Sequence, residues 1–130
     1  MIYAVDNHRY LTRVPHEATY LRWKSRMTAE ELQAVKDELN RRIDGGDIHV
    51  SSWIPGSDWT DTVFDPIYSK ACHCDEDAAG MFFGLILWDV LMERDDVWGF
   101  GRYSKGGIPI TGLTYFKLEN PPPLDERVLA

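Results

Sequence analysis

The stretch DEDAAGMFFGLILWDVLMER, residues 75–94, decides the fold that we expect for this chain. The three acids that open it suit an N-cap and a first helical turn, where negative charge complements the helix dipole. From residue 81 to 92 only Gly84 and Asp89 are not large hydrophobic residues. The pattern predicts a helix over about 76–94. Because it is apolar almost all round, this helix has to be covered on every side and is the expected core.

What covers the predicted helix is open from sequence alone. Its apolar run is about a dozen residues, whereas a bilayer needs about 20, so we expect no membrane span. Gly80 and Gly84 lie four residues apart and allow another backbone to approach closely. They pack either against the domain's own sheet or against a second copy of the chain. We predict a homodimer through the helix around Gly80–Gly84.

A second helix is predicted over about 29–43. Thr28 and Glu31 have the spacing of a capping box, and Met27 with Leu32 that of a hydrophobic staple. The other expected features are an apolar face of Leu32, Val35, Leu39 and Ile43, ion pairs Asp37–Arg41 and Glu38–Arg42, and an end at Gly45–Gly46.

The strands are less regular. We predict strands at 47–54, 97–103 and 110–118, the last two as a hairpin turning at 104–107, and one or two more strands among 2–5, 9–14 and 18–23. Pro15 places the later N-terminal stretches at an edge or in a loop. Glycines at 99, 101 and 112 indicate a bulge or a ring crossing the backbone closely. A short helical turn is expected at Asp65–Pro66.

The predicted fold class is α+β. It comprises a mostly antiparallel sheet of four to six strands, with two main helices (about 29–43 and 76–94) packed on it and a C-terminal hairpin at about 97–118. Residues 1–119 are expected to form a single domain, and residues 120–130, which open with three prolines, an extended arm.

Charge and cysteine content exclude some functions. The net charge is −7, and residues 47–96 hold eleven acids against Lys70 and Arg94, which argues against nucleic-acid binding. The N-terminus has no apolar segment long enough for a signal peptide. The two cysteines would form a strained bridge, which fits a reducing compartment, so we expect a cytoplasmic protein.

The run Cys72-His73-Cys74-Asp75 resembles a metal site at first reading. Zinc sites normally need thiolates two or more residues apart and a second ligand pair, and the other histidines are scattered. The three acids are explained by helix capping, and they would raise the pKa of a nucleophilic Cys74. We therefore predict no metal and no cofactor.

The segment SSWIPGSDWTDTVFDPIY, residues 51–68, interleaves aromatic and acidic residues in a turn-rich stretch. Aromatic walls with carboxylates suit a cationic or amphipathic small molecule. The structural alternative is that the tryptophans plug the sheet and the aspartates form turns. Asp89, alone in an apolar helix, is either functional or paired with an Arg or a Tyr hydroxyl. The predicted ligand-binding residues are Trp53, Asp58, Trp59, Asp61, Tyr68 and Asp89.

Taken together, these patterns favour a non-enzymatic binding protein with an aromatic and acidic pocket for a small cationic or amphipathic ligand. Two alternatives remain open at this point. One is a small enzyme that uses a buried aspartate as general acid or base, although no catalytic residue is assigned. The other is an interaction module or inhibitor whose acidic surface meets a basic partner.

Overall fold

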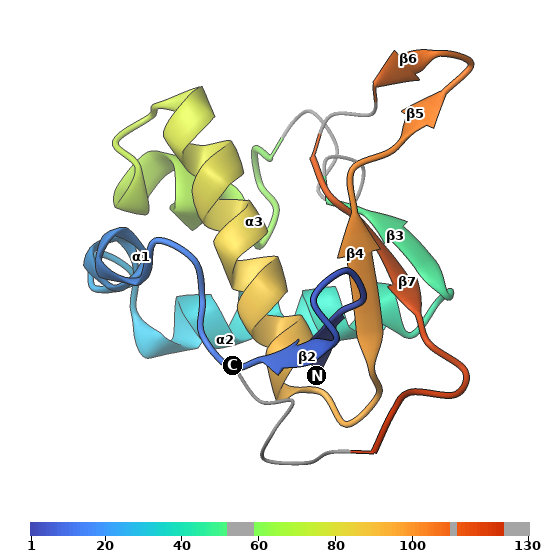
Figure 1. The fold of residues 1–130 in the computed structure, drawn as a ribbon. Coiled ribbons are helices and arrows are strands. Elements are labelled where there is room, and N and C mark those ends of the chain that lie inside the picture. The colour runs from blue at the N-terminus through green and yellow to red at the C-terminus, as the bar shows by residue number, and fades with distance from the viewer. Residues whose placement is uncertain (52–58, 110–111, 124–130) are drawn as a thin grey trace.

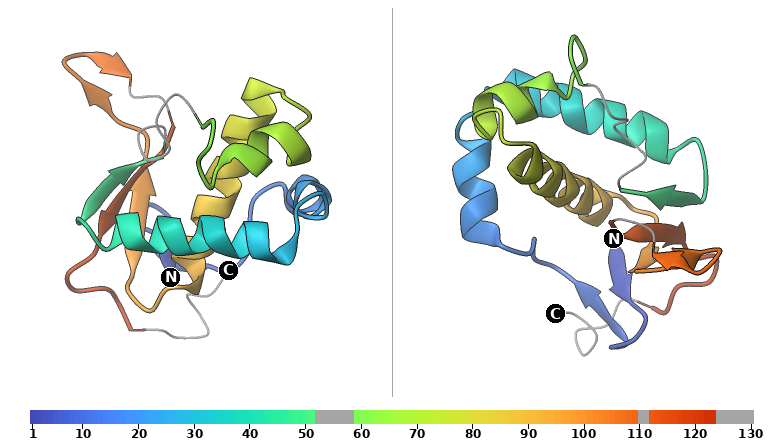
Figure 2. Two further views of the ribbon diagram at one scale, coloured as in Figure 1. Left: turned by 180° about the vertical axis from the view of Figure 1, so that it is seen from behind. Right: turned by 90° about the horizontal axis from the view of Figure 1, so that it is seen from above.

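The structure is a computed structural model that describes residues 1–51, 59–109 and 112–123. Strands β2, β1, β4, β7 and β3 form a five-stranded sheet in that order, and β5 with β6 forms a separate two-stranded sheet. The helices lie on one side of the larger sheet (Figures 1 and 2). The elements are β1 (Ile2–Ala4), β2 (Arg9–Leu11), α1 (Glu17–Lys24), α2 (Ala29–Ile43), β3 (Ile48–Val50), η1 (Ile67–Ala71), α3 (Glu76–Glu93), β4 (Trp98–Gly101), β5 (Ser104–Lys105), β6 (Ile108–Pro109) and β7 (Thr114–Lys117).

The predicted α+β class with a mostly antiparallel sheet is confirmed. Both N-terminal strands join the same sheet as the C-terminal hairpin, with β2 at one edge and β3 at the other. One pairing is parallel, between β1 and β4 through Ile2 and Trp98. The remaining pairs are antiparallel. The sheet is therefore mixed, and its first strand is inserted between β2 and β4.

Helix α2 has the predicted bounds. The Thr28 side chain accepts from the Glu31 backbone N–H, and the Glu31 carboxylate accepts from the Thr28 N–H, so the capping box is present. The Glu38–Arg42 pair forms. The Asp37–Arg41 prediction is wrong, because Arg41 turns to Glu38 and Asp37 accepts from Gln33 instead.

The stretch 18–23, considered as a strand, lies in helix α1. Tyr20 is buried in the core, and three residues on Trp23 packs partly buried against the same core, which is helical spacing. Both rings contact Phe82 of α3, with centroids 5.9 and 5.5 Å away. Tertiary packing against α3 therefore outweighs the β-forming tendency of Thr and Tyr in this stretch.

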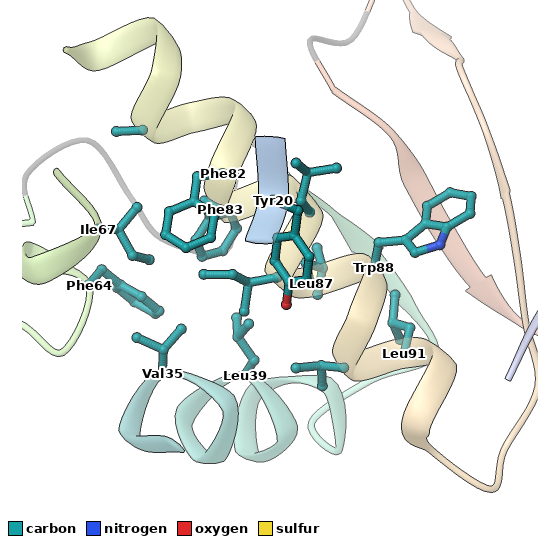
Figure 3. Packing of buried hydrophobic residues seen from close by; sticks show 14 of the residues in the cluster. Tyr20, Val35, Leu39, Phe64, Ile67, Phe82, Phe83, Leu87, Trp88 and Leu91 are labelled. Carbon is teal, nitrogen blue, oxygen red and sulfur yellow. The ribbon is translucent and has the colours of Figure 1, made fainter. Parts of the chain in front are cut away.

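Helix α3 forms the core of the fold, as predicted, and ends one residue earlier than expected, at Glu93. Asp75 caps it by accepting from the Ala78 N–H. Figure 3 shows the α3 side chains meeting apolar residues of α2, of α1 and of the segment before α3. The buried α3 residues are Ala79, Phe82, Phe83, Leu85, Ile86, Leu87, Trp88, Val90 and Leu91.

The predicted C-terminal hairpin is present, but in two parts. Strands β4 and β7 pair within the main sheet, and β5 with β6 forms a small arm that projects beyond it (Figure 1). The arm turns at Gly106 and Gly107, whose φ angles of 60° and 81° suit glycine. The predicted close ring crossings are also found: a Cβ on Gly99 would lie 2.7 Å from Phe116 Cζ, and one on Gly101 2.8 Å from Tyr103 Oη.

The other predicted strands are shorter than expected. In the described part of the strand predicted at 47–54, the structure has β3; residues 52–54 of that stretch and residues 110–111 of the last predicted strand lie outside the described residues. The helical turn at Asp65–Pro66 continues as the π-helix η1, in which the Cys72 N–H donates to the Ile67 carbonyl. Of the Pro-rich arm, Pro122 accepts a hydrogen bond from the Tyr10 hydroxyl.

A polar cluster closes the C-terminal end of α3. The Arg94 guanidinium donates to Asp96, to Asp44 after α2, and to Asn40. The Met1 amino group donates to the carbonyls of Leu91, Arg94 and Asp96 at 2.6–2.7 Å. A cation at this end complements the helix dipole, so the start of β1 is fixed beside the end of α3.

Candidate functional site

Asp89, the polar residue within the apolar face of α3, is held by two other helices. The Tyr20 hydroxyl of α1 donates to Asp89 Oδ2 at 2.6 Å. Lys36 Nζ of α2 lies 3.7 Å from the same oxygen and 2.8 Å from Glu93 Oε1. The Lys36 and Asp89 side chains are only 14% and 15% exposed. Asp89 is therefore paired with a Tyr hydroxyl, as the structural alternative expected.

Tyr20 is a poor acid in this position. Burial raises its pKa above the usual 10.0, and the hydrogen bond to Asp89 adds to the shift. Its proton therefore stays on the hydroxyl and remains committed to Asp89. The Tyr20–Asp89–Lys36 group links α1, α3 and α2 at one point. It therefore helps to position α1 on the rest of the fold.

The aromatic and acidic segment is only partly described, because Trp53 and Asp58 lie outside the described residues. Trp59 packs on the core with ring centroids 6.3 Å from Phe64 and 5.8 Å from Phe83. Tyr68 is partly buried against the same core, in η1. Trp59 therefore lies partly buried against core rings of α3 and of the segment before η1, rather than against the sheet as the structural alternative had it.

Asp61 is exposed in a turn at a φ of 59°, a conformation that Asp tolerates better than most residues. Asp89 does not join this segment. It follows Phe83, the neighbour of Trp59, by six residues, which is about 240° around a helix. The structure thus brings Trp59 and Tyr68 to the same hydrophobic cluster, whereas Asp89 lies on another side of α3.

The two cysteines lie in different surroundings. Cys72 is buried in the core, and burial raises its pKa to about 11. Cys74 is exposed, and both it and His73 have positive φ angles, of 62° and 50°. Over the described parts of the chain, no group of three His, Cys, Asp or Glu side chains could hold a metal ion.

A surface cleft of about 420 Å³ lies beside Tyr20. It is lined by the loop after β2, by α1 and by Met92 of α3. Trp88 Nε1 donates to the Arg13 carbonyl at 3.1 Å and so fixes the loop against α3. We call this the α1 cleft; its lining residues are Thr12, Arg13, Val14, Glu17, Tyr20, Leu21 and Met92.

The α1 cleft is amphipathic. Val14, Leu21 and Met92 give it apolar surface, and Arg13 and Glu17 bring opposite charges to it. Neither charge forms an ion pair with a residue that the structure describes. The cleft was not among the predicted sites, because its lining comes from a loop, from a helix that was not predicted and from the far end of α3.

The predicted dimer face is open within the described chain. A Cβ placed on Gly80 or Gly84 would meet no described atom within 4 Å. Met81 beside them is 41% exposed, although α3 is otherwise the core element. Within the described residues, these glycines therefore do not pack against the domain's own sheet, which was one of the two alternatives.

No family model, curated protein or solved structure matches this chain. Within the described residues, no helix is both long and apolar enough to cross a bilayer.

Proposed function

We propose that this chain is a cytoplasmic, non-enzymatic binding protein that holds a small amphipathic molecule in the α1 cleft. The observation that carries the proposal is the pairing of apolar surface with Arg13 and Glu17, whose charges have no described ion partner. The volume of the α1 cleft, about 420 Å³, falls in the usual range of small-molecule sites. Two free cysteines accord with a reducing compartment.

The α1 cleft is preferred to the segment 53–68 because Trp59 is engaged with the core rings. Asp89 is given a positioning role rather than that of a general acid or base, since Tyr20 and Lys36 already satisfy it. In this proposal the Tyr20–Asp89–Lys36 group holds α1 in place, and the cleft beside it takes the ligand.

The test uses the fluorescent amphiphile 1-anilinonaphthalene-8-sulfonate as the probe. We expect saturable fluorescence enhancement with the wild-type protein and a loss of at least about tenfold in affinity for Leu21→Glu, which places a negative charge beside the anionic probe. Leu21 is 52% exposed, so the substitution should leave folding intact. Ile48→Glu, at 69% exposure on the far edge strand, is the matched control. Equal probe binding by both variants would refute the site.

A second proposal concerns assembly: the protein forms a homodimer through the exposed face of α3 around Gly80–Gly84. The open glycines and exposed Met81 support it. Residues 97–118 contain three basic residues and no acid, whereas α3 is preceded and opened by three acids. Two copies related by a twofold axis can thus bring opposite charges together.

A further inference from the structure

We propose that the α1 cleft recognises a zwitterionic α-amino acid with an aliphatic side chain. The inference rests on the proposed function and names the chemical class of its ligand. Three properties of the cleft carry it: an apolar surface, one cation and one anion, all lining a single depression.

The apolar part of the cleft defines the ligand side chain. Val14, Leu21 and Met92 come from three different elements, so a branched aliphatic group can contact all of them at once. Methionine adapts its shape to such a group because its chain is unbranched. The Tyr20 ring also lines the cleft, but its hydroxyl is committed to Asp89 and is not a competing donor.

The two charges define the ligand's polar end. The Arg13 guanidinium presents a planar fork that matches a carboxylate. The Glu17 carboxylate can accept from an ammonium group. Because each lacks an ion partner within the described residues, a ligand carrying both charges would satisfy both at once. A ligand with only one charge would leave the other unpaired.

Other ligand classes fit the lining less well. A nucleotide or sugar phosphate needs more positive charge than one arginine beside a carboxylate supplies. A divalent cation needs several oxygen ligands, whereas Glu17 is the one carboxylate among the described residues that line the cleft. A neutral lipid would leave both charges without a partner.

Tertiary contacts hold the backbone at both charged positions. The Arg13 carbonyl is bound by Trp88, and Glu17 lies one turn before Tyr20, which is bound to Asp89. The backbone that carries both charges is therefore set before binding, which lowers the entropic cost of recognition.

The experiment measures binding of three matched probes by isothermal titration calorimetry. The probes are L-leucine, L-leucinamide, which lacks the carboxylate, and N-acetyl-L-leucine, which lacks the ammonium group. We expect L-leucine to bind best, and each analogue to bind about five- to tenfold more weakly, as loss of one charged hydrogen bond implies.

Two variants test which ligand group each charged residue binds. Arg13→Met should weaken L-leucine about five- to tenfold but leave L-leucinamide unchanged, because that probe has no carboxylate to lose. Glu17→Gln should weaken L-leucine but leave N-acetyl-L-leucine unchanged. Equal affinity of the three probes for the wild type, or equal weakening of all three by either variant, would overturn the assignment. An unchanged urea midpoint for each variant separates lost recognition from lost folding.

The outcome also separates this inference from the proposed function. If anilinonaphthalene sulfonate binds in the α1 cleft and L-leucine does not, the ligand class is wrong and the binding site stands. If neither probe binds, both are wrong.

Discussion

The hydroxyl of Tyr20 in α1 lies 2.6 Å from Asp89 Oδ2 in α3, and this hydrogen bond joins the shortest α-helix of the described chain to its core helix. Lys36 of α2 lies 3.7 Å from the same oxygen. Three helices therefore meet at one carboxylate, which adds a polar link to the packing of Tyr20 and Trp23 on Phe82.

Removal of the Tyr20 hydroxyl should be destabilising. Tyr20→Phe keeps the ring packing but leaves a nearly buried carboxylate oxygen without its donor, so we expect the free energy of unfolding to fall by about 1–2 kcal/mol. Urea denaturation followed by circular dichroism measures this loss. Tyr103→Phe, at an exposed tyrosine, is the control and should change it by less than about 0.5 kcal/mol. A loss for Tyr20→Phe as small as the control's would contradict the link.

The same tyrosine predicts a loss of stability at high pH. Its pKa is raised by burial in the folded state, so the proton contributes stability that is present below pH 10.0 and is lost as pH rises above it. Burial also raises the pKa of Tyr115, so wild type and Tyr20→Phe must be compared. Above about pH 10 the wild-type free energy of unfolding should fall more steeply, by about 1.4 kcal/mol per pH unit. Parallel curves would show that Tyr20 does not titrate differently on unfolding.

The free energy of unfolding at acid pH depends in part on Asp96. Hydrogen bonds from Arg94 lower its pKa from 3.8 to about 2, so its contribution to stability is present above about pH 4 and is lost as pH falls through about 2. Asp96→Asn should therefore lower the free energy of unfolding by about 1–2 kcal/mol at pH 7 and much less near pH 2. Thermal denaturation over this pH range tests it. A loss that does not change with pH would rule out the charged pair as the cause.

Two glycines should respond in opposite directions to the same substitution. Gly99→Ala places a methyl group against the Phe116 ring and should cost about 1–3 kcal/mol of stability. Gly80→Ala meets no described atom of its own chain within 4 Å, so at concentrations at which the protein is monomeric it should gain up to about 1 kcal/mol of helix stability. Urea midpoints measure both. The double variant Gly99→Ala/Phe116→Ala should recover part of the first loss, and failure to do so would show that the ring is not the obstacle.

The dimer proposal predicts a dimeric mass by native mass spectrometry at micromolar concentration. Met81→Glu adds a charge to the exposed α3 face and should convert the dimer to monomers without a change in far-ultraviolet circular dichroism. Val5→Glu, at a residue of similar exposure outside α3, is the control and should remain dimeric. A monomeric wild type would remove the proposal.

The parts of the fold that were predicted correctly are those determined by local chemistry. The capping box at Thr28 and Glu31 and the apolar run of α3 depend on residues close in sequence, and both helices were predicted to within a residue. Helix α1 was not predicted. It is stabilised by contacts of Tyr20 and Trp23 with Phe82, which is distant in sequence. Propensity alone does not include such contacts.

The candidate site shows the same division. A Tyr hydroxyl was foreseen as one partner of Asp89, but the identity of Tyr20 depends on how α1 packs. Trp59 was expected to line a pocket, and its contacts with Phe64 and Phe83 depend on how α3 packs. The α1 cleft had no sequence signal, because Arg13 and Met92 come together only when the loop after β2 docks on α3.

The insertion of β1 between β2 and β4 has a consequence for synthesis on the ribosome. The hairpin of β1 and β2 emerges well before β4, yet Ile2 pairs with Trp98, and β4 pairs in turn with β7. The nascent chain must therefore keep β1 unpaired on one side until β4 has left the exit tunnel. Completion of the sheet is a late event, and until then the exposed edge of β1 is a point at which a chaperone can bind.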